Sequence, residues 1–324
     1  LGMVNLQPDN EMKTENLRSQ LRQHYNVQTT DLATSDLDNI DVLLVSGTTD
    51  SVDKKTLDNL EGFLNNGKKV FLAQSAISAD IQAQMANPIN SNIFAFIEKY
   101  GLKIKKNLVL DNECQSVQVQ ERRGIFMMNR AMRYPFFPNV RNFNKSEIIV
   151  ADLEQVVPFY PSEIVLDTME VDLVAGTTEL FRSSNKSGSM ENNFILSPDP
   201  QQNPFINMLN QNGKILAASS KLVNGGELIL ISDTKFLSDE AGMSVPDNMI
   251  FLLNTADYLT GEKELISLRS REITNRPLKK LEDSTRKNWK WANMLLPSLL
   301  VLSFAYFQRK KENSRASMLE QIYD

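Results

Sequence analysis

The chain has 324 residues and a formal net charge of −5, and its hydrophobic and charged fractions, 41% and 23%, are those of an ordinary globular protein. This composition excludes intrinsic disorder over most of the chain, and a mean hydropathy of −0.31 with one long apolar run excludes a polytopic membrane protein. General nucleic-acid binders carry a basic excess, whereas here 40 acidic residues outnumber 35 Lys and Arg.

Cysteine and histidine are scarce. Cys114 is the one cysteine and His24 the one histidine, so an intramolecular disulfide and zinc sites built from Cys or His pairs are excluded. We expect a passive role for Cys114. For His24, at the end of a helix, we expect a partly buried packing role or an interaction with the helix dipole at its carboxyl end. We also expect no metal and no cofactor.

The first part of the chain, residues 1–115, alternates amphipathic helices with apolar strands. The pattern predicts helices at 12–25, 51–66 and 93–100, and strands at 27–32, 41–46, 69–73, 102–105 and 107–111. Such alternation is typical of right-handed crossovers and a mainly parallel sheet with helices on both faces. The sequence therefore predicts an α/β fold class.

The middle of the chain is basic and aromatic between residues 121 and 145. Pro135 and Pro138 favour a loop or irregular excursion there. Because arginine and aromatic side chains anchor many interfaces, the stretch is a candidate partner surface, and a solvated loop folded onto the core is an equally open interpretation. The residues of the candidate surface are Arg122, Arg123, Arg130, Arg133, Phe136 and Phe137.

Regular patterns return after this stretch. Strands are predicted at 147–150, 163–166, 180–181, 214–219 and 227–232, the last two joined by the hairpin signal Asn224-Gly225-Gly226, and a helix at 248–259. We divide the chain into five parts. A first α/β lobe is residues 1–115, and a second lobe of the same module is residues 116–261. A charged juxtamembrane stalk (262–288), a transmembrane helix (289–307) and a short basic tail (308–324) follow.

The apolar run is residues 289–307, which as a helix spans about 28 Å, close to the hydrocarbon thickness of a bilayer. Aromatic residues flank it at both ends and basic residues follow it, as in a spanning helix. A buried core helix is the alternative, but basic clusters at both ends argue against it. The charges on the two sides are too similar to set the orientation. The anchor residues are Trp289, Trp291, Leu295, Leu296, Leu299, Leu300, Phe304 and Tyr306.

Motifs that would carry catalysis are incomplete. Residues 62–69 match a phosphate-binding loop except at Lys69, where Ser or Thr is required, and the segment leads from a helix into a strand, so we interpret it as a helix end. Ser46, Asp111 and Asp233 each end an apolar strand. The carboxyl ends of parallel strands often bind ligands, so these three form a candidate ligand pocket; the alternative is that each aspartate caps the following turn.

The order of several segments resembles a known family. The chain is similar to ABC-transporter auxiliary proteins, in particular to the gliding-motility-associated (GldG-like) members of Bacteroidetes. The segments that carry the resemblance, besides the basic-flanked terminal helix, are 41–47, 66–73, 100–111, 226–239, 248–261 and 266–273.

The resemblance implies a periplasmic α/β domain over residues 1–288, of a glutamine-amidotransferase-like or flavodoxin-like type and related to intraflagellar-transport-type domains. It also implies an anchor at each end in the inner (cytoplasmic) membrane, a cytoplasmic tail at 309–324, and an ABC permease and a separate ATPase as partners. No N-terminal anchor or signal peptide is visible after Leu1, so we expect a processed or partial chain.

Three functions follow from these observations. The first is a non-catalytic, membrane-anchored auxiliary subunit of an ABC transporter linked to gliding motility or secretion. The alternative is a periplasmic solute-binding component that presents a ligand to the permease. An amidotransferase-like or hydrolytic enzyme is suggested by fold analogy alone. We therefore expect the chain not to be an enzyme.

Overall fold

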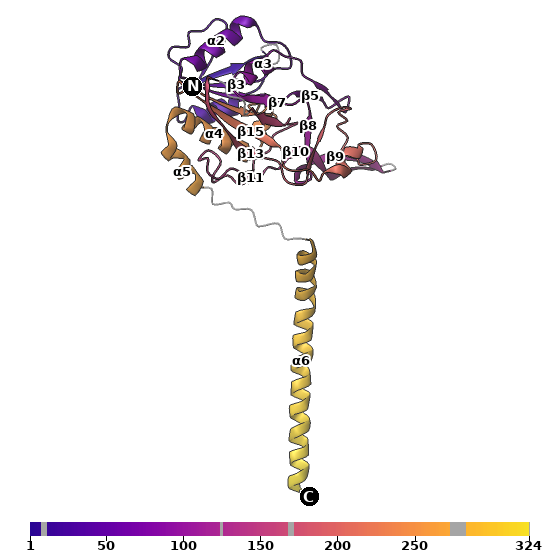
Figure 1. The fold of residues 1–324 in the computed structure, drawn as a ribbon. Helices are drawn as coiled ribbons and strands as arrows, with labels where there is room; N and C mark the ends of the chain where they lie inside the picture. Colours follow the sequence, from indigo (N-terminus) through magenta and orange to yellow (C-terminus); the bar gives the residue numbers. More distant parts are fainter. Residues whose placement is uncertain (8–11, 124–125, 168–171, 273–282, 324) are drawn as a thin grey trace. The chain divides into compact units, whose positions relative to one another are not determined.

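The computed structural model describes residues 1–7, 12–123, 126–167, 172–272 and 283–323, and it divides the chain into two compact units (Figure 1). Unit 1 is residues 1–272 and unit 2 is residues 273–324.

The core of unit 1 is a ten-stranded mixed sheet. Its parallel part has the order β2-β1-β3-β4-β16, which are Gln28–Thr29, Gly2–Asn5, Val42–Ser46, Lys69–Ala73 and Glu227–Ile231. The sheet continues with antiparallel strands β15 (Ile215–Leu222), β13 (Val174–Arg182) and β11 (Asn142–Phe143). In addition, β12 (Ile164–Leu166) pairs with β15, and β7 (Leu102–Ile104) pairs with β12. The parallel strands and their flanking helices confirm the expected α/β fold class. The hairpin predicted at 224–226 is also confirmed, and it joins β15 to β16.

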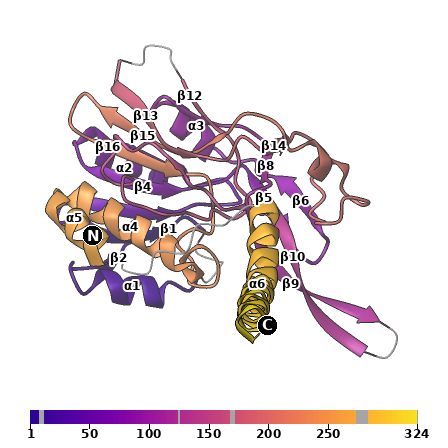
Figure 2. The ribbon, with the colours of Figure 1, turned by 90° about the horizontal axis from the view of Figure 1, so that it is seen from below.

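Helices cover both faces of the parallel strands (Figure 2). The side chains of β3 alternate, as in any strand: Val42 and Leu44 pack with α1 (Glu15–Leu21) and α4 (Pro246–Thr260). Leu43 and Val45 pack on the other face with α2 (Lys54–Asn65) and α3 (Ile93–Glu98). Both faces of these strands are therefore buried, which explains why they are almost continuously apolar.

Helix ends follow the local sequence. The Asp53 carboxylate accepts a hydrogen bond from the Lys55 N–H (3.0 Å) and caps α2. Gly67, with φ of 76°, ends the turn after α2, and Gly261, with φ of 93°, ends α4. Pro246 begins α4, where its missing N–H costs no hydrogen bond.

Two sequence expectations for the middle of the chain are wrong. Most of the basic stretch is an antiparallel hairpin of β9 (Cys114–Arg123) and β10 (Phe126–Pro138), not a loop. The regular register runs to Arg133 and shifts before Pro138, so Pro135 lies where the ladder is interrupted and no N–H is needed. Residues 147–150 form turns, and the strand-like pattern there reflects the burial of Ile149 and Val150.

Smaller elements complete unit 1. They are the hairpin of β5 (Ile77–Asp80) and β6 (Met85–Pro88), the pair β8 (Leu108–Asp111) and β14 (Ser187–Met190), the 3₁₀ helices Pro204–Met208 and Gly242–Ser244, and α5 (Lys263–Glu272). Residues 263–272 were expected to be part of a stalk and are helical. Of the rest of that stalk, residues 273–282 lie outside the described residues.

Unit 2 contains α6, Asp283–Tyr323, a helix of 41 residues that is about 62 Å long. Residues 284–311 form a 28-residue segment long and apolar enough to cross a bilayer, which includes the predicted span 289–307. Pro297 lies inside this helix, as membrane helices tolerate.

Candidate functional site

The apolar segment of α6 exposes its side chains on all sides, and none of it is buried in the structure. The length and composition of the segment are those of a spanning helix, in agreement with the predicted anchor. The predicted anchor residues are exposed by 52–67%: Trp289, Trp291, Leu295, Leu296, Leu299, Leu300, Phe304 and Tyr306. Large apolar side chains exposed around a helix are stable in hydrocarbon, so α6 is the candidate membrane anchor.

The carboxyl edge of the parallel strands is filled by the protein's own polar groups. The Gln74 amide accepts a hydrogen bond from the Thr48 N–H (2.8 Å) and donates to the carbonyls of Thr48 (2.9 Å) and Ser75 (2.7 Å). At Gly47 a Cβ atom would lie 2.3 Å from Gln74 Oε1, so the strand end fits against this amide only as glycine. The residue Ser46 is 3% exposed, and its Oγ lies 3.3 Å from Met12 Sδ.

Asp233 lies at the same edge, and its register places it two strands from Ser46, across β4. Its carboxylate accepts hydrogen bonds from the N–H groups of Phe159 (2.9 Å) and Lys235 (2.9 Å). Burial raises the pKa of Asp233 to about 7, although these hydrogen bonds and the charge of Lys235 act in the opposite direction.

Asp111 ends β8, in a separate two-stranded sheet. Its carboxylate accepts hydrogen bonds from the Ser184 N–H and hydroxyl (both 2.6 Å) and from the Glu113 N–H (2.8 Å). Burial raises the pKa of Asp111, and these bonds oppose the rise. The three predicted pocket residues, Ser46, Asp111 and Asp233, are thus at most 3% exposed. The two aspartates cap the turns that follow their strands, and the structure does not bring all three residues to one sheet.

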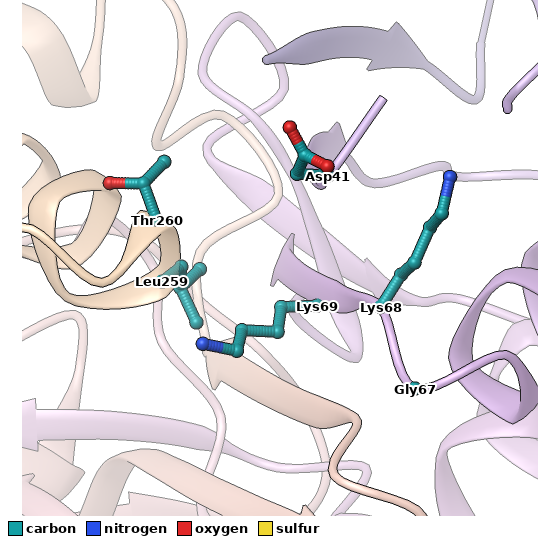
Figure 3. Close-up of a pocket in the computed structure, with 6 residues that line it drawn as sticks. All are labelled: Asp41, Gly67, Lys68, Lys69, Leu259 and Thr260. Atoms are coloured by element: carbon teal, nitrogen blue, oxygen red, sulfur yellow. The ribbon is translucent and has the colours of Figure 1, made fainter. Parts of the chain in front are cut away.

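A hollow of about 310 Å³ lies at the opposite, amino-terminal edge of the strands (Figure 3). The Lys69 side chain extends toward Leu259, whereas Lys68 points away and donates to the carbonyls of Leu37 (2.8 Å) and Asp38 (3.0 Å). The lining residues are Asp41, Gly67, Lys68, Lys69, Leu259 and Thr260. Its charged groups nearly balance, so the hollow has no strong preference for anions or cations.

A buried carboxyl group lies on the strand next to Lys69, which lines this hollow. Glu227, at the start of β16, is 6% exposed and accepts a hydrogen bond from the Tyr258 hydroxyl (3.3 Å). Burial raises the pKa of Glu227, while the charges of Lys221 and Lys69 lower it. Sequence reasoning missed this edge. The one signal nearby was the incomplete phosphate-binding motif, of which residues 67–69 line the hollow, although Lys68 is turned away from it.

The single histidine and the single cysteine lie in different parts of unit 1. His24 is exposed in the turn after α1, so a partly buried packing role is wrong, and a role at the carboxyl end of the helix stays a prediction. Cys114 is partly exposed at the start of β9, and burial is the largest cause that raises the pKa of its thiol, with a small contribution from Asp111. A raised thiol pKa lowers the thiolate fraction and hence the reactivity.

The β9–β10 hairpin has two different parts. We call residues 134–138 the root. Phe136 is fully buried, Phe137 stacks on Phe159 with ring centroids 4.2 Å apart, and the hydroxyls of Tyr134 and Tyr160 are 3.2 Å apart. Phe136 therefore belongs to the interior, and its assignment to a partner surface is corrected; Phe137 is half-buried and packs against the same cluster.

We call residues 116–123 and 126–133 the arm, which projects from unit 1 in both views (Figures 1 and 2). Arg130 and Arg133 are exposed, as are Met127 (64%) and Met128 (54%). Arg122 and Arg123 lie in β9, opposite Met127 and Phe126, and their side chains lie outside the described part of the structure. The predicted partner surface is thus reduced to the arm.

Comparison with known proteins decides the family. Residues 2–255 match the model of a family described as "ABC-type uncharacterized transport system". The chain belongs to this family. An uncharacterized protein of Borreliella burgdorferi is 24% identical over 284 residues, which cover 81% of this chain. The chain spans about half, 54%, of the length of that curated relative.

Solved structures show which fold this member of the ABC-type transport family shares. The N-terminal domain of mmIFT52 superposes with a TM-score of 0.52 at 13% identity, covering 80% of this chain and 97% of that domain. This likeness shows a common fold alone. A putative ThuA-like protein from Bacteroides uniformis is 12% identical, with a TM-score of 0.44 and coverage of 80% and 89%.

Proposed function

We propose that this chain is a non-catalytic, membrane-anchored auxiliary subunit of an ABC transporter, which couples through unit 1 to a permease and a separate ATPase. The family match over residues 2–255 is the observation that carries the proposal. The exposed apolar helix α6 supports it, because it supplies an anchor. In this proposal unit 1 is periplasmic, α6 crosses the inner (cytoplasmic) membrane, and the residues after 308 are cytoplasmic.

The non-catalytic role is supported by how the polar groups are used. The aspartates and amides at the carboxyl edge hydrogen-bond within the protein, and burial raises the pKa of the Cys114 thiol. The proposal assigns nucleotide hydrolysis to the separate ATPase subunit.

The finer assignments are also part of the proposal. The parallel strands have the order 2-1-3-4-16, and the order of flavodoxin-like folds is 2-1-3-4-5, which supports a flavodoxin-like or glutamine-amidotransferase-like ancestry for unit 1. We further propose that the transporter serves gliding motility or secretion, as in the GldG-like proteins of Bacteroidetes that the sequence resembles.

Co-purification tests the function. The tagged full-length chain is extracted from membranes in mild detergent, and the proteins that accompany it are identified and quantified. The proposal predicts a permease and an ATPase in a fixed ratio to the chain. Recovery of the chain without either would contradict it.

The anchor has its own test. Leu299→Arg combined with Leu300→Arg places two charges near the middle of the span, where each costs roughly 3 kcal/mol of insertion free energy. We expect the variant to leave the membrane fraction. Leu268→Arg, at an exposed leucine in α5, is the matched control and should stay membrane-bound.

The hollow favours one second candidate, a solute-binding component. Lys69, Thr260 and Asp41 could together bind a small zwitterionic or polar solute in about 310 Å³. A ligand at 100 times its Kd would raise the unfolding free energy by about 2.7 kcal/mol, which a thermal-shift screen detects. A ligand whose binding is abolished by Lys69→Ala would support this role. Lys54→Ala, at an exposed position of α2, is the control and should preserve binding. A hit insensitive to Lys69→Ala would place the ligand elsewhere.

A further inference from the structure

The arm is a two-stranded ribbon that pairs with no further strand among the described residues. Its regular register runs from the pair Phe126–Arg123 to the pair Arg133–Ser116. An isolated hairpin is at best marginally stable in water, and here only the root is fixed in the interior. A ribbon of this kind keeps exposed apolar side chains that a partner could cover.

Charge distinguishes the arm from the rest of the chain. It carries four arginines and one glutamate, whereas the whole chain has a net charge of −5. Arginine and methionine are both enriched in the cores of protein interfaces. The composition of the arm is therefore that of a contact surface for a partner of opposite charge.

The side chains of the arm alternate between its two faces. Met128, Arg130 and Met132 lie on one face, and Met127 and Arg133 lie on the other, so both faces present arginine and methionine. A flat surface, such as a lipid bilayer, can contact one face of a ribbon at a time. A groove contacts both faces, and the arm is built alike on both.

We propose that the arm inserts into a groove lined with carboxylates on the permease, with arginines from both faces of the ribbon pairing with acidic side chains. This inference rests on the proposed function, because it presumes the permease as partner. A second copy of the chain fits less well, because the charges of Lys69 and Asp41 nearly balance in the hollow on its surface, which is therefore not an acidic groove.

The experiment compares three full-length variants with the wild-type chain in the co-purification described above. Arg130→Glu with Arg133→Glu reverses the charge of both faces. Because Arg133 also hydrogen-bonds the Cys114 thiol, a second variant, Arg130→Glu with Met128→Ser, leaves that contact intact. Lys54→Glu with Lys145→Glu changes two exposed lysines away from the arm and matches the change in net charge of the first variant.

We expect both arm variants to recover about tenfold less permease than the wild type, while their melting temperatures and membrane extraction stay unchanged. The lysine variant should recover the wild-type amount. Added salt should weaken recovery with the wild-type chain more than with either arm variant, because the arginine–carboxylate pairs are screened. Reversing permease carboxylates to lysine should restore binding of the double-glutamate variant.

Three results would overturn the inference. Undiminished recovery of the permease by both arm variants would show that the arm does not bind it, although the proposed function would stand. Loss of pairing between two differently tagged copies, with the permease retained, would identify a second copy as the partner. Loss of binding to phosphatidylglycerol vesicles, again with the permease retained, would identify a lipid surface. If the wild-type chain recovers no permease or ATPase, the proposed function itself fails.

Discussion

The two ends of strand β10 belong to the same strand and have opposite environments. At the root, Phe136 is fully buried and Phe137 stacks on Phe159; along the arm, Met127 and Met128 are more than half exposed. The cross-strand register is regular along the arm and interrupted in the root, so strand pairing is not what fixes the root more firmly than the arm. The difference shows that aromatic packing holds the hairpin to unit 1 and leaves the arm available for contact.

The strongest test of this contrast removes one side chain from each part. Phe136→Ala empties a fully buried site and should lower the unfolding free energy by about 3–5 kcal/mol, while Met128→Ala in the arm should change it by less than about 0.5 kcal/mol. Urea unfolding of the full chain in detergent measures both. Equal losses would mean that the arm is packed as tightly as the root.

A second test addresses the support under the root. Ser75 donates to the Tyr160 carbonyl (2.9 Å) and adjoins Gln74, which fills the space beside Gly47. Gly47→Ala places a Cβ 2.3 Å from Gln74 Oε1 and should cost about 1–3 kcal/mol. Gly62→Ala, in an open position of α2, should stabilise by up to about 1 kcal/mol. A neutral Gly47→Ala would show that the edge is loosely packed.

The pH dependence of stability tests the contact of Asp233 with the root. Its carboxylate accepts a hydrogen bond from the N–H of Phe159, the residue on which Phe137 stacks. The folded pKa of about 7 lies above the ordinary value of 3.8, so the stabilising contribution is fully present below pH 3.8 and is lost as pH rises toward 7. Between pH 5 and 7 wild-type stability should fall relative to Asp233→Asn by roughly 1 kcal/mol per pH unit. Parallel stability curves for the two proteins would contradict a raised pKa.

The smallest expected effect is on the arm itself. Arg130→Glu with Arg133→Glu should leave the melting temperature within about 2 °C, because exposed charges contribute little to folding. The same pair should change partner binding strongly. A large drop in melting temperature, absent in Lys54→Glu with Lys145→Glu, would show that the arginines stabilise the fold instead of a complex.

The regular parts of the fold could be predicted from sequence because period and burial agree there. The run Val42–Val45 is apolar on both faces, and the Asn224-Gly225-Gly226 turn leaves few alternatives to a hairpin. Prolines misled the prediction for residues 126–138, since proline disfavours a strand unless the ladder is interrupted, and the shift in register is a property of the folded hairpin.

The candidate sites were harder to predict for a different reason. Asp111 and Asp233 end similar apolar strands, but β8 and β16 lie in separate sheets, and strand pairing depends on contacts distant in sequence. Phe136 and Arg133 are three residues apart in one stretch, and the sequence gives no sign that one is buried and the other exposed. The hollow beside Lys69 forms only when β4 and the end of α4 meet.

The most direct measurement of the central claim is the composition of the complex purified through the tagged full-length chain. The account predicts a permease and an ATPase in constant ratio, retained by Leu268→Arg and lost with Leu299→Arg and Leu300→Arg. A wild-type chain that is extracted from the membrane intact but unaccompanied, or that hydrolyses a substrate by itself, would contradict it.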